Sequence, residues 1–203
     1  LDRCLQYDAY NRHAFRSLVF GAGRSLEDYR LGRLAESSAL AGGPFEVVTA
    51  EGERCALAGK DPSCLCEVWN EISIAGSSLT AEWRLKYAGL AEVRGGLELV
   101  LNLLAPDAHD RYFVLPGGAG RPRLAWAGEA KGDCLALVDE WGNLRIDVRV
   151  RPAAVWWILP IYTVSRSEGG FEKVYQGSAI LPHWAAEGAE LRALVKLSFG
   201  PAR

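Results

Sequence analysis

Histidines and carboxylates are the residues of this chain whose spacing could support acid-base or metal chemistry. The three histidines, His13, His109 and His183, lie far apart, and none falls in a metal-binding spacing such as HxxxH. The motifs GxSxG, GxxxxGK and GxGxxG are absent, so acyl transfer and nucleotide chemistry lack their usual sequence support. A sugar-cleaving site needs two carboxylates about 5 to 10 Å apart, but most turn carboxylates only cap or solvate the chain. The carboxylates at expected turns and strand ends are Asp107, Asp110, Asp139, Glu140, Glu168 and Glu172.

The five cysteines do not follow a disulfide or zinc pattern. Cys64 and Cys66 are separated by one residue, whereas structural zinc ligands come in pairs two to four residues apart with a second pair to match. An odd number of scattered cysteines is also unlike the framework of a small secreted domain. We therefore expect small buried thiols in a reducing cytoplasm, and no metal or cofactor.

Aromatic side chains crowd the last 80 or so residues. A flat ring is a natural platform for the apolar face of a pyranose, although the same rings would serve equally well in a protein core. Trp156 and Trp157 are adjacent, so they point to opposite faces of a strand. We expect one to face the core and the other to lie against solvent, a neighbouring domain or a sugar. The aromatic residues of this segment are Trp126, Trp141, Trp156, Trp157, Tyr162, Tyr175 and Trp184.

Length and composition predict one well-cored domain that spans residues 1–203. Of the 203 residues, 49% are hydrophobic, which excludes intrinsic disorder. A net charge of -2 gives no overall attraction for nucleic acid or anionic membranes. The longest strongly apolar stretch, residues 153–162, is too short to cross a bilayer. The sequence lacks Met and begins with Leu1, from which we expect a part of a longer polypeptide.

Alternation of apolar and polar residues is the dominant pattern and predicts an all-β fold, a large antiparallel β-sandwich. One short helix is expected over residues 25–37, where Ser25 and Asp28 match a capping box. Residues 75–78 are expected to form a hairpin turn. The expected strands are 45–49, 64–74, 79–87, 97–103, 111–115, 134–138, 144–150, 154–159, 174–181 and 191–199.

Residues 159–184, LPIYTVSRSEGGFEKVYQGSAILPHW, resemble a signature of the C-terminal β-sandwich domain of glycoside hydrolase family 57 alpha-amylase and 4-alpha-glucanotransferase enzymes. Three other segments are similar in the expected order, so the resemblance spans nearly the whole chain. One departure follows Phe15, where relatives carry an Asp-His pair and this chain has Arg16, Ser17 and Leu18. The three segments are residues 7–15 (YDAYNRHAF), 102–112 (NLLAPDAHDRY) and 139–142 (DEWG).

The resemblance implies a galactose-mutarotase-like supersandwich and a division of labour within a longer enzyme. In the family, the catalytic residues belong to an N-terminal (β/α) barrel, and no barrel pattern is present in this chain. The resemblance thus implies a non-catalytic module without cofactor. Its expected roles are to pack on the N-terminal catalytic barrel and to contact alpha-glucans such as starch or maltodextrin.

The candidate site residues belong mostly to the signature segment. Residues 167–170 are expected to form a turn, and the strand that follows, residues 171–181, is expected to end at Pro182. Glu168, Gln176 and His183 would then form a polar rim that docks a partner domain or holds a sugar. The full candidate set for carbohydrate binding or domain docking is Trp141, Trp157, Glu168, Gln176, His183 and Trp184.

Two other functions fit the same residues. One is a self-contained, mutarotase-like epimerase in which Glu168 or Glu172 is the base and His183 the acid. The other is a purely structural or oligomerising domain, which would expose an apolar patch.

Overall fold

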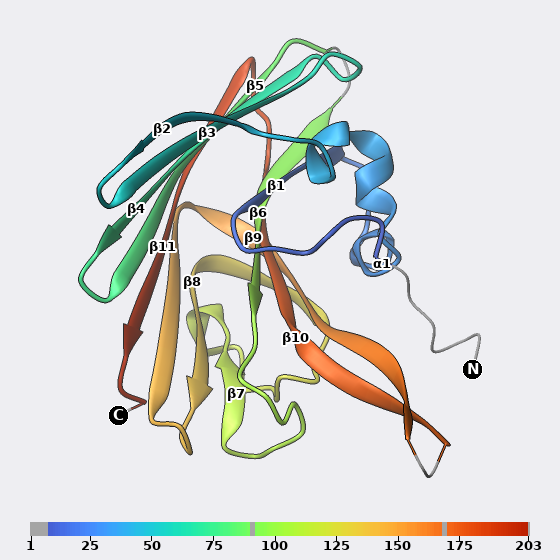
Figure 1. The fold of residues 1–203 in the computed structure, drawn as a ribbon, viewed down its shortest axis with the longest axis vertical. Coiled ribbons are helices and arrows are strands. Elements are labelled where there is room, and N and C mark those ends of the chain that lie inside the picture. Colours follow the sequence, from blue (N-terminus) through green and yellow to red (C-terminus); the bar gives the residue numbers. More distant parts are fainter. Residues whose placement is uncertain (1–7, 90–91, 168–169, 203) are drawn as a thin grey trace.

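The fold is an antiparallel β-sandwich built from one continuous sheet, as the alternating sequence pattern predicts (Figure 1). The computed structural model describes residues 8–89, 92–167 and 170–202. Within these residues eleven strands pair in the order β1-β6-β10-β9-β11-β5-β4-β3-β2, with β8 pairing both β7 and β9. The strands are β1 Arg16–Gly21, β2 Glu46–Glu51, β3 Arg54–Asp61, β4 Cys66–Ala75, β5 Ser78–Tyr87, β6 Val93–Leu101, β7 Arg111–Val114, β8 Gly128–Asp139, β9 Leu144–Ser167, β10 Gly170–Ala185 and β11 Glu190–Gly200.

Strand β9 joins the two layers of the sandwich. Its first part, residues 145–151, pairs with β11, and its second part, residues 155–167, pairs with β10. The first layer therefore contains β2–β5, β11 and the start of β9, and the second contains β1, β6, β10 and the rest of β9. Strand β8 pairs with both parts of β9, and β7 pairs with β8. Residues 144–150 and 154–159, which we expected to form two strands, belong to this one long strand.

The main core lies between the two layers. Trp83 and Val195 of the first layer belong to the same buried cluster as Leu99, Trp156 and Ile180 of the second. Alternate residues of each strand face this cluster, which is why the sequence alternates so regularly.

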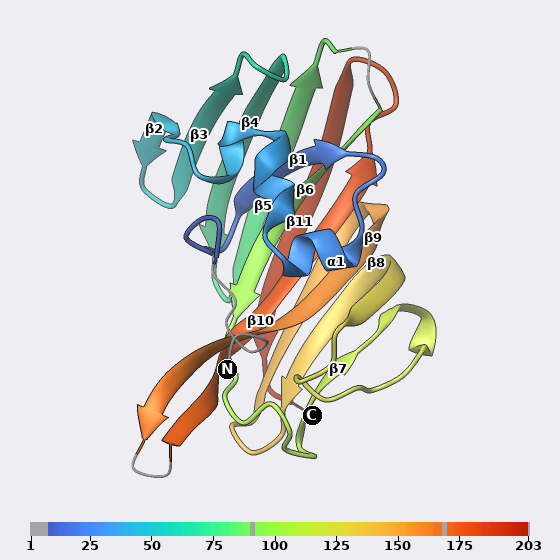
Figure 2. The ribbon, with the colours of Figure 1, turned by 90° about the vertical axis from the view of Figure 1, so that its right-hand side faces the viewer.

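A second apolar cluster covers the outer face of the second layer. Tyr29 of α1, Leu26–Arg30, packs there against Trp157 and Leu181, together with Phe20 and Leu34. Two 3-10 turns, Arg33–Ser37 and Ala39–Ala41, continue the helical segment that Figure 2 shows lying across this face. A third 3-10 turn is Pro116–Gly118. The second layer is therefore covered on both sides.

This cover changes the expectation for the tryptophan pair. Trp156 and Trp157 do point to opposite faces, but both are buried, because the N-terminal segment covers the face on which Trp157 lies. We predicted that one of the two lies against solvent, a neighbouring domain or a sugar. That prediction was wrong, because both side chains are buried by other described residues.

Sequence patterns predicted the structure correctly where contacts between close neighbours in sequence determine it. The Ser25 side chain accepts a hydrogen bond from the Asp28 backbone while the Asp28 side chain accepts from the Ser25 backbone, which confirms the capping box. The expected strands miss β1, whose central residues are buried on both faces and so do not alternate, and β3, which is rich in small residues. Pro182 does not end its strand: the β10–β6 ladder skips Leu181 and Pro182, and β10 continues to Ala185.

No helix in the described ranges is both long enough and apolar enough to cross a membrane.

Candidate functional site

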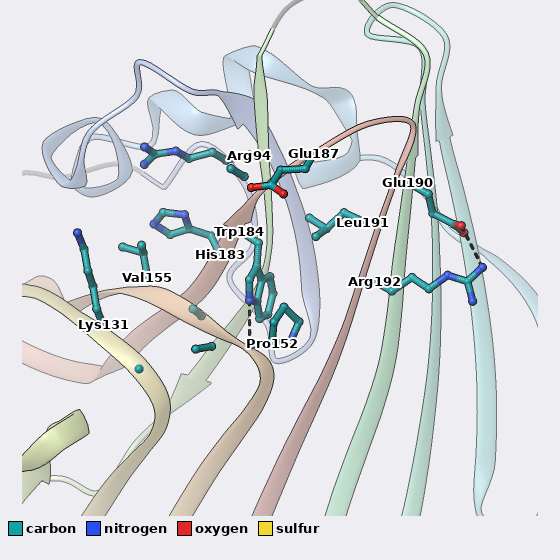
Figure 3. A pocket seen from close by; sticks show the side chains of 14 residues that line it. Arg94, Lys131, Pro152, Val155, His183, Trp184, Glu187, Glu190, Leu191 and Arg192 are labelled. Carbon is teal, nitrogen blue, oxygen red and sulfur yellow. Dashed lines mark hydrogen bonds and ion pairs between the residues drawn. The ribbon is translucent and has the colours of Figure 1, made fainter.

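A pocket of about 680 Å³ lies where strands β8, β9, β10 and β11 approach one another (Figure 3). A cross-strand row defines one side of it: Gly96 pairs with His183, His183 with Val155, and Val155 with Lys131. Antiparallel pairing places the side chains of such a row on the same face, so His183, Val155 and Lys131 stand next to one another. Trp184, the next residue along β10, points to the opposite side of the strand.

His183 is the most unusual group at this pocket. Its side chain is buried with 1% exposure between Trp157, at a ring distance of 4.4 Å, and Phe20, at 5.5 Å. Neither imidazole nitrogen has a hydrogen-bond partner among the described residues. Burial, reinforced by the positive charge of Arg94, lowers the pKa of His183 to about 3. The ring is therefore neutral at pH 7 and carries one unused N–H donor and one unused nitrogen acceptor.

Trp184 forms part of the opposite wall. Its indole Nε1–H donates to the carbonyl of Pro152 at 3.0 Å, and its ring stacks on Trp83 of the first layer at 6.2 Å. Because the ring is only 6% exposed, Trp184 fixes the wall of the pocket rather than offering an open stacking platform.

Charged groups form the rim of the pocket, around the buried apolar side chains that line it. The guanidinium of Arg192 donates to Glu190 at 2.9 Å and holds the pKa of that carboxyl below its usual value. Arg94, Lys131 and Glu187 have no ion pair within the described residues. A pocket with an apolar floor and unpaired charged groups at its rim suits a polar ligand that also has apolar faces, as a sugar has.

The structure brings two of the six candidate residues, Trp157 and His183, into contact, whereas Trp184 points to the opposite side of β10. Trp157 contacts His183, and Trp184 follows it in sequence; the indole N–H of Trp157 donates to Glu129 at 2.9 Å. Gln176 lies elsewhere, on an exposed hairpin, where its amide donates to Thr163. It is seven residues from His183 along an extended strand, roughly 23 Å. Trp141, 82% exposed, lies in the turn after β8, and Glu168 lies outside the described residues.

The same spacing argues against Glu172 and His183 as a catalytic pair. They are eleven residues apart on β10, roughly 36 Å at the rise of an extended strand. General acid and base must both reach one substrate, so these two side chains cannot share a sugar.

Two of the turn carboxylates that we considered for catalysis, Asp139 and Glu140, have structural partners. Asp139 lies 3.2 Å from the guanidinium of Arg111, and the hydroxyl of Tyr112 donates to Glu140 at 2.9 Å. Both contacts tie β7 to the end of β8.

The cysteines of the described residues, Cys55, Cys64, Cys66 and Cys134, are free thiols. The Cys66 thiol donates to the carbonyl of Cys64, and burial raises its pKa. Across residues 8–89, 92–167 and 170–202, no three His, Cys, Asp or Glu side chains are grouped so that they could hold a metal. Cys4 lies outside the described residues.

Sequence reasoning missed the charged rim of the pocket. Lys131 and Arg192 each occupy a polar position of an alternating strand, and charged side chains at such positions normally face solvent without a further role. Only the pairing of β8 with β9, and of β9 with β10 and β11, brings them toward His183, and no local signal specifies that pairing.

Residues 1–197 match the family described as alpha-amylase/4-alpha-glucanotransferase, C-terminal, which confirms the resemblance seen in the sequence. A segment of 86 residues, 42% of this chain, is 37% identical to Alpha-amylase 1 of Dictyoglomus thermophilum and covers 12% of that protein. Among solved structures, the 4-alpha-glucanotransferase of Thermococcus litoralis matches 97% of this chain with a TM-score of 0.78 and 19% identity. This chain spans only 29% of that enzyme.

A putative aldose 1-epimerase of Escherichia coli K12 has the same fold at lower similarity. It matches 81% of this chain and 71% of its own, with a TM-score of 0.56 and 10% identity. At that identity the likeness concerns the fold alone, and it agrees with the mutarotase-like sandwich that we expected.

Proposed function

Because this chain belongs to the alpha-amylase/4-alpha-glucanotransferase C-terminal family, we propose that it is the non-catalytic C-terminal module of a longer alpha-glucan-processing enzyme. In this proposal the module packs on the catalytic domain that precedes it and contributes weak contacts to starch- or maltodextrin-like chains. Its location is the cytoplasm, which suits its free thiols.

The observation that carries this proposal is the extent of the family match. It includes residues 1–197, whereas the same chain spans less than a third of the Thermococcus litoralis glucanotransferase. A module that is a minor part of its relatives needs another part of the enzyme to supply the chemistry. The separation of Glu172 from His183 and the structural partners of Asp139 and Glu140 support the same division.

The pocket beside His183 is the proposed contact for the glucan. A glucose unit presents hydroxyls at its rim and C–H groups on its faces, and the pocket offers the charged groups of Lys131 and Arg94 on either side of Val155 and the buried His183. Trp157 and Trp184 adjoin this pocket, so their fluorescence would report its occupation.

Titration of the 203-residue chain with maltoheptaose, followed by tryptophan fluorescence and calorimetry, tests the glucan contact. We expect saturable binding in the millimolar range and none for cellohexaose, whose linkage differs. Lys131→Ala should weaken binding at least threefold. The matched control Lys196→Ala, an exposed lysine of β11 outside the pocket, should leave it unchanged. No response at millimolar maltoheptaose would remove the sugar role and leave only the structural one.

A polarimetric assay on glucose and galactose separates this proposal from the epimerase alternative. We expect the uncatalysed rate of mutarotation, since His183 has no carboxylate partner in the described residues. A rate that rises with protein concentration and falls in His183→Leu would favour the enzyme instead.

A further inference from the structure

The outer parts of β9 and β10 form a two-stranded ribbon that extends beyond the sandwich (Figures 1 and 2). We define it as the projecting hairpin, residues 161–167 and 170–177, paired from Tyr162 with Tyr175 outward to Ser167 with Gly170. A bulge between Tyr175 and Gly177 separates it from the body of the sheet. In the described residues, no other strand pairs with the part beyond this bulge.

One face of the projecting hairpin continues the core side of the second layer. Along β9, Trp156 and Ile158 belong to the main core, and the period of two places Tyr162, Val164 and Arg166 on the same side. Their partners across the ribbon are Tyr175, Lys173 and Phe171. Inside the sandwich this side packs against the first layer, and we call its continuation on the hairpin the aromatic face.

The opposite face of the hairpin is mostly polar. Thr163 and Ser165 lie there with Glu172, and the apolar residues of this face are Val174 and, at the base of the hairpin, Ile161. The hairpin is thus amphipathic in the same sense as a strand that has one buried side.

The aromatic face is exposed at its outer end and partly buried at its base, where Tyr175 packs against the main core. Phe171 is 61% exposed. Tyr162 meets Tyr175 edge to face at 5.8 Å, and Nζ of Lys173 lies 3.9 Å from the centre of the Tyr162 ring. Neither Lys173 nor Arg166 has an ion pair with a described residue. A two-stranded ribbon is marginally stable in water, so the exposed ring of Phe171, together with the partly buried ring of Tyr162, points to a surface that covers this face.

We propose that the aromatic face of the projecting hairpin docks on the preceding, catalytic part of the longer enzyme, on an apolar surface flanked by carboxylates. This rests on the proposed function. The preceding part of the enzyme is large enough to cover this face, because the Thermococcus litoralis enzyme is more than three times the length of the matched region. Because Lys173 and Arg166 are positively charged, we expect carboxylates at the rim of the surface on which the hairpin docks.

A second copy of this chain is a poorer occupant. A two-fold interface brings the same patch of both copies together, so Lys173 and Arg166 would meet basic groups of the other copy. Like charges at an interface oppose association.

Hydrogen exchange of the full-length enzyme and of the 203-residue chain tests the docking. We expect amides of the projecting hairpin to exchange at least tenfold more slowly in the full-length enzyme. Phe171→Asp should abolish this difference, and the control Val174→Asp, on the opposite face, should preserve it. Both side chains are exposed in this structure, so both variants of the 203-residue chain should melt within a few degrees of the unsubstituted one. Equal exchange in the two proteins would overturn the docking.

The outcomes separate docking from the proposed function. If the gene encodes no catalytic domain before these residues, the proposed function fails; if it does and the hairpin is unprotected, only the docking fails. A concentration-dependent dimer of the 203-residue chain that Phe171→Asp dissociates would assign the face to a second copy and refute the proposal.

Discussion

The hydroxyl of Tyr29 in α1 donates a hydrogen bond of 2.6 Å to Oε1 of Glu98 in β6, across 69 residues of sequence. The same oxygen accepts from the hydroxyl of Tyr10 at 2.9 Å and from the guanidinium of Arg12 at 2.8 Å. Arg12 also lies over the ring of Tyr29, at 5.1 Å. The buried carboxylate of Glu98 therefore fastens the N-terminal segment to the outer face of the second layer, over Trp157.

Substitutions in this network should be costly in proportion to the polar groups they leave unpaired. Glu98→Ala removes the acceptor of two hydroxyls and one of the two carboxylates that pair with Arg12, and we expect it to lower the free energy of unfolding by about 3 to 5 kcal/mol. Tyr29→Phe removes one donor and should cost about 1 to 2 kcal/mol. Urea unfolding at pH 7 measures both. Tyr112→Phe is the matched control, because its bond to Glu140 is exposed, and should cost about 0.5 kcal/mol or less. A Glu98→Ala variant as stable as Tyr112→Phe would contradict the fastening role.

This network also shows which features the sequence does not predict. Glu98 alternates with Leu97 and Leu99, so period two assigns it to a solvated face, and it becomes buried only because Tyr10 and Tyr29 cover that face. Strand identity and the capping box at Ser25 depend on neighbours in sequence and were predictable. Which strands pair, and what covers the outside of a layer, depends on contacts far apart in sequence.

The candidate site likewise has some features that the sequence predicts and others that depend on strand pairing. His183 and Trp184 stand out in the sequence as a polar-aromatic pair, and their opposite orientations follow from the strand period. The separation of Gln176 from His183 would also follow from an unbroken strand, but we expected the strand to end at Pro182. Lys131 joins the pocket only through the β8–β9 register.

The buried imidazole of His183 should make stability depend on pH. Its pKa of about 3 in the folded protein lies below the ordinary value of 6.5, so the unfolded chain binds more protons between these values. Stability contributed by neutral His183 is complete above pH 6.5 and is lost as the pH falls toward 3. Between pH 7 and pH 4 the loss should be about 3 kcal/mol.

Urea unfolding of the wild-type chain and of His183→Leu at pH 7, 6, 5 and 4 isolates this contribution. The variant should lose less stability than the wild-type chain on acidification, since leucine does not titrate. Parallel pH profiles of the two proteins would show that His183 is not buried as a neutral ring.

Asp61 stabilises the connection between the 3-10 turns and β3. It accepts from the hydroxyl of Ser38 at 2.9 Å, the backbone N–H of Ala39 at 2.6 Å, and the hydroxyl and N–H of Ser63 at 2.6 and 3.0 Å. Burial opposes the charge, but these donors outweigh it and hold the pKa of Asp61 well below its usual range. The stability that ionised Asp61 contributes is therefore present at neutral pH and lost as the pH falls below about 4.

Asp61→Ala should lower the free energy of unfolding by about 2 to 4 kcal/mol at pH 7, because it leaves buried donors without an acceptor. Asp133→Ala, at an exposed position of β8, is the control and should change stability by about 0.5 kcal/mol or less. The difference in thermal stability between the two variants should shrink as the pH falls from 4 to 2, because the unfolded chain protonates Asp61 at a higher pH than the folded protein does. A difference that persists unchanged at pH 2 would assign the cost of Asp61→Ala to packing instead of charge.

Gly96 sets the close approach of β6 to β10 beside the pocket. A Cβ at this position would lie 2.6 Å from the carbonyl oxygen of Pro182 and 2.9 Å from Cβ of His183, closer than non-bonded atoms approach. Since the first of these atoms is backbone, Gly96→Ala must separate the strands, and we expect a loss of about 2 to 3 kcal/mol. The displacement should also widen the pocket at His183 and weaken maltoheptaose binding. Gly21→Ala is the control, because no atom lies within 4 Å of its added Cβ. It should stay within about 0.5 kcal/mol of the wild-type chain. Equal stabilities of the two variants, measured by urea unfolding, would show that β6 and β10 yield without cost.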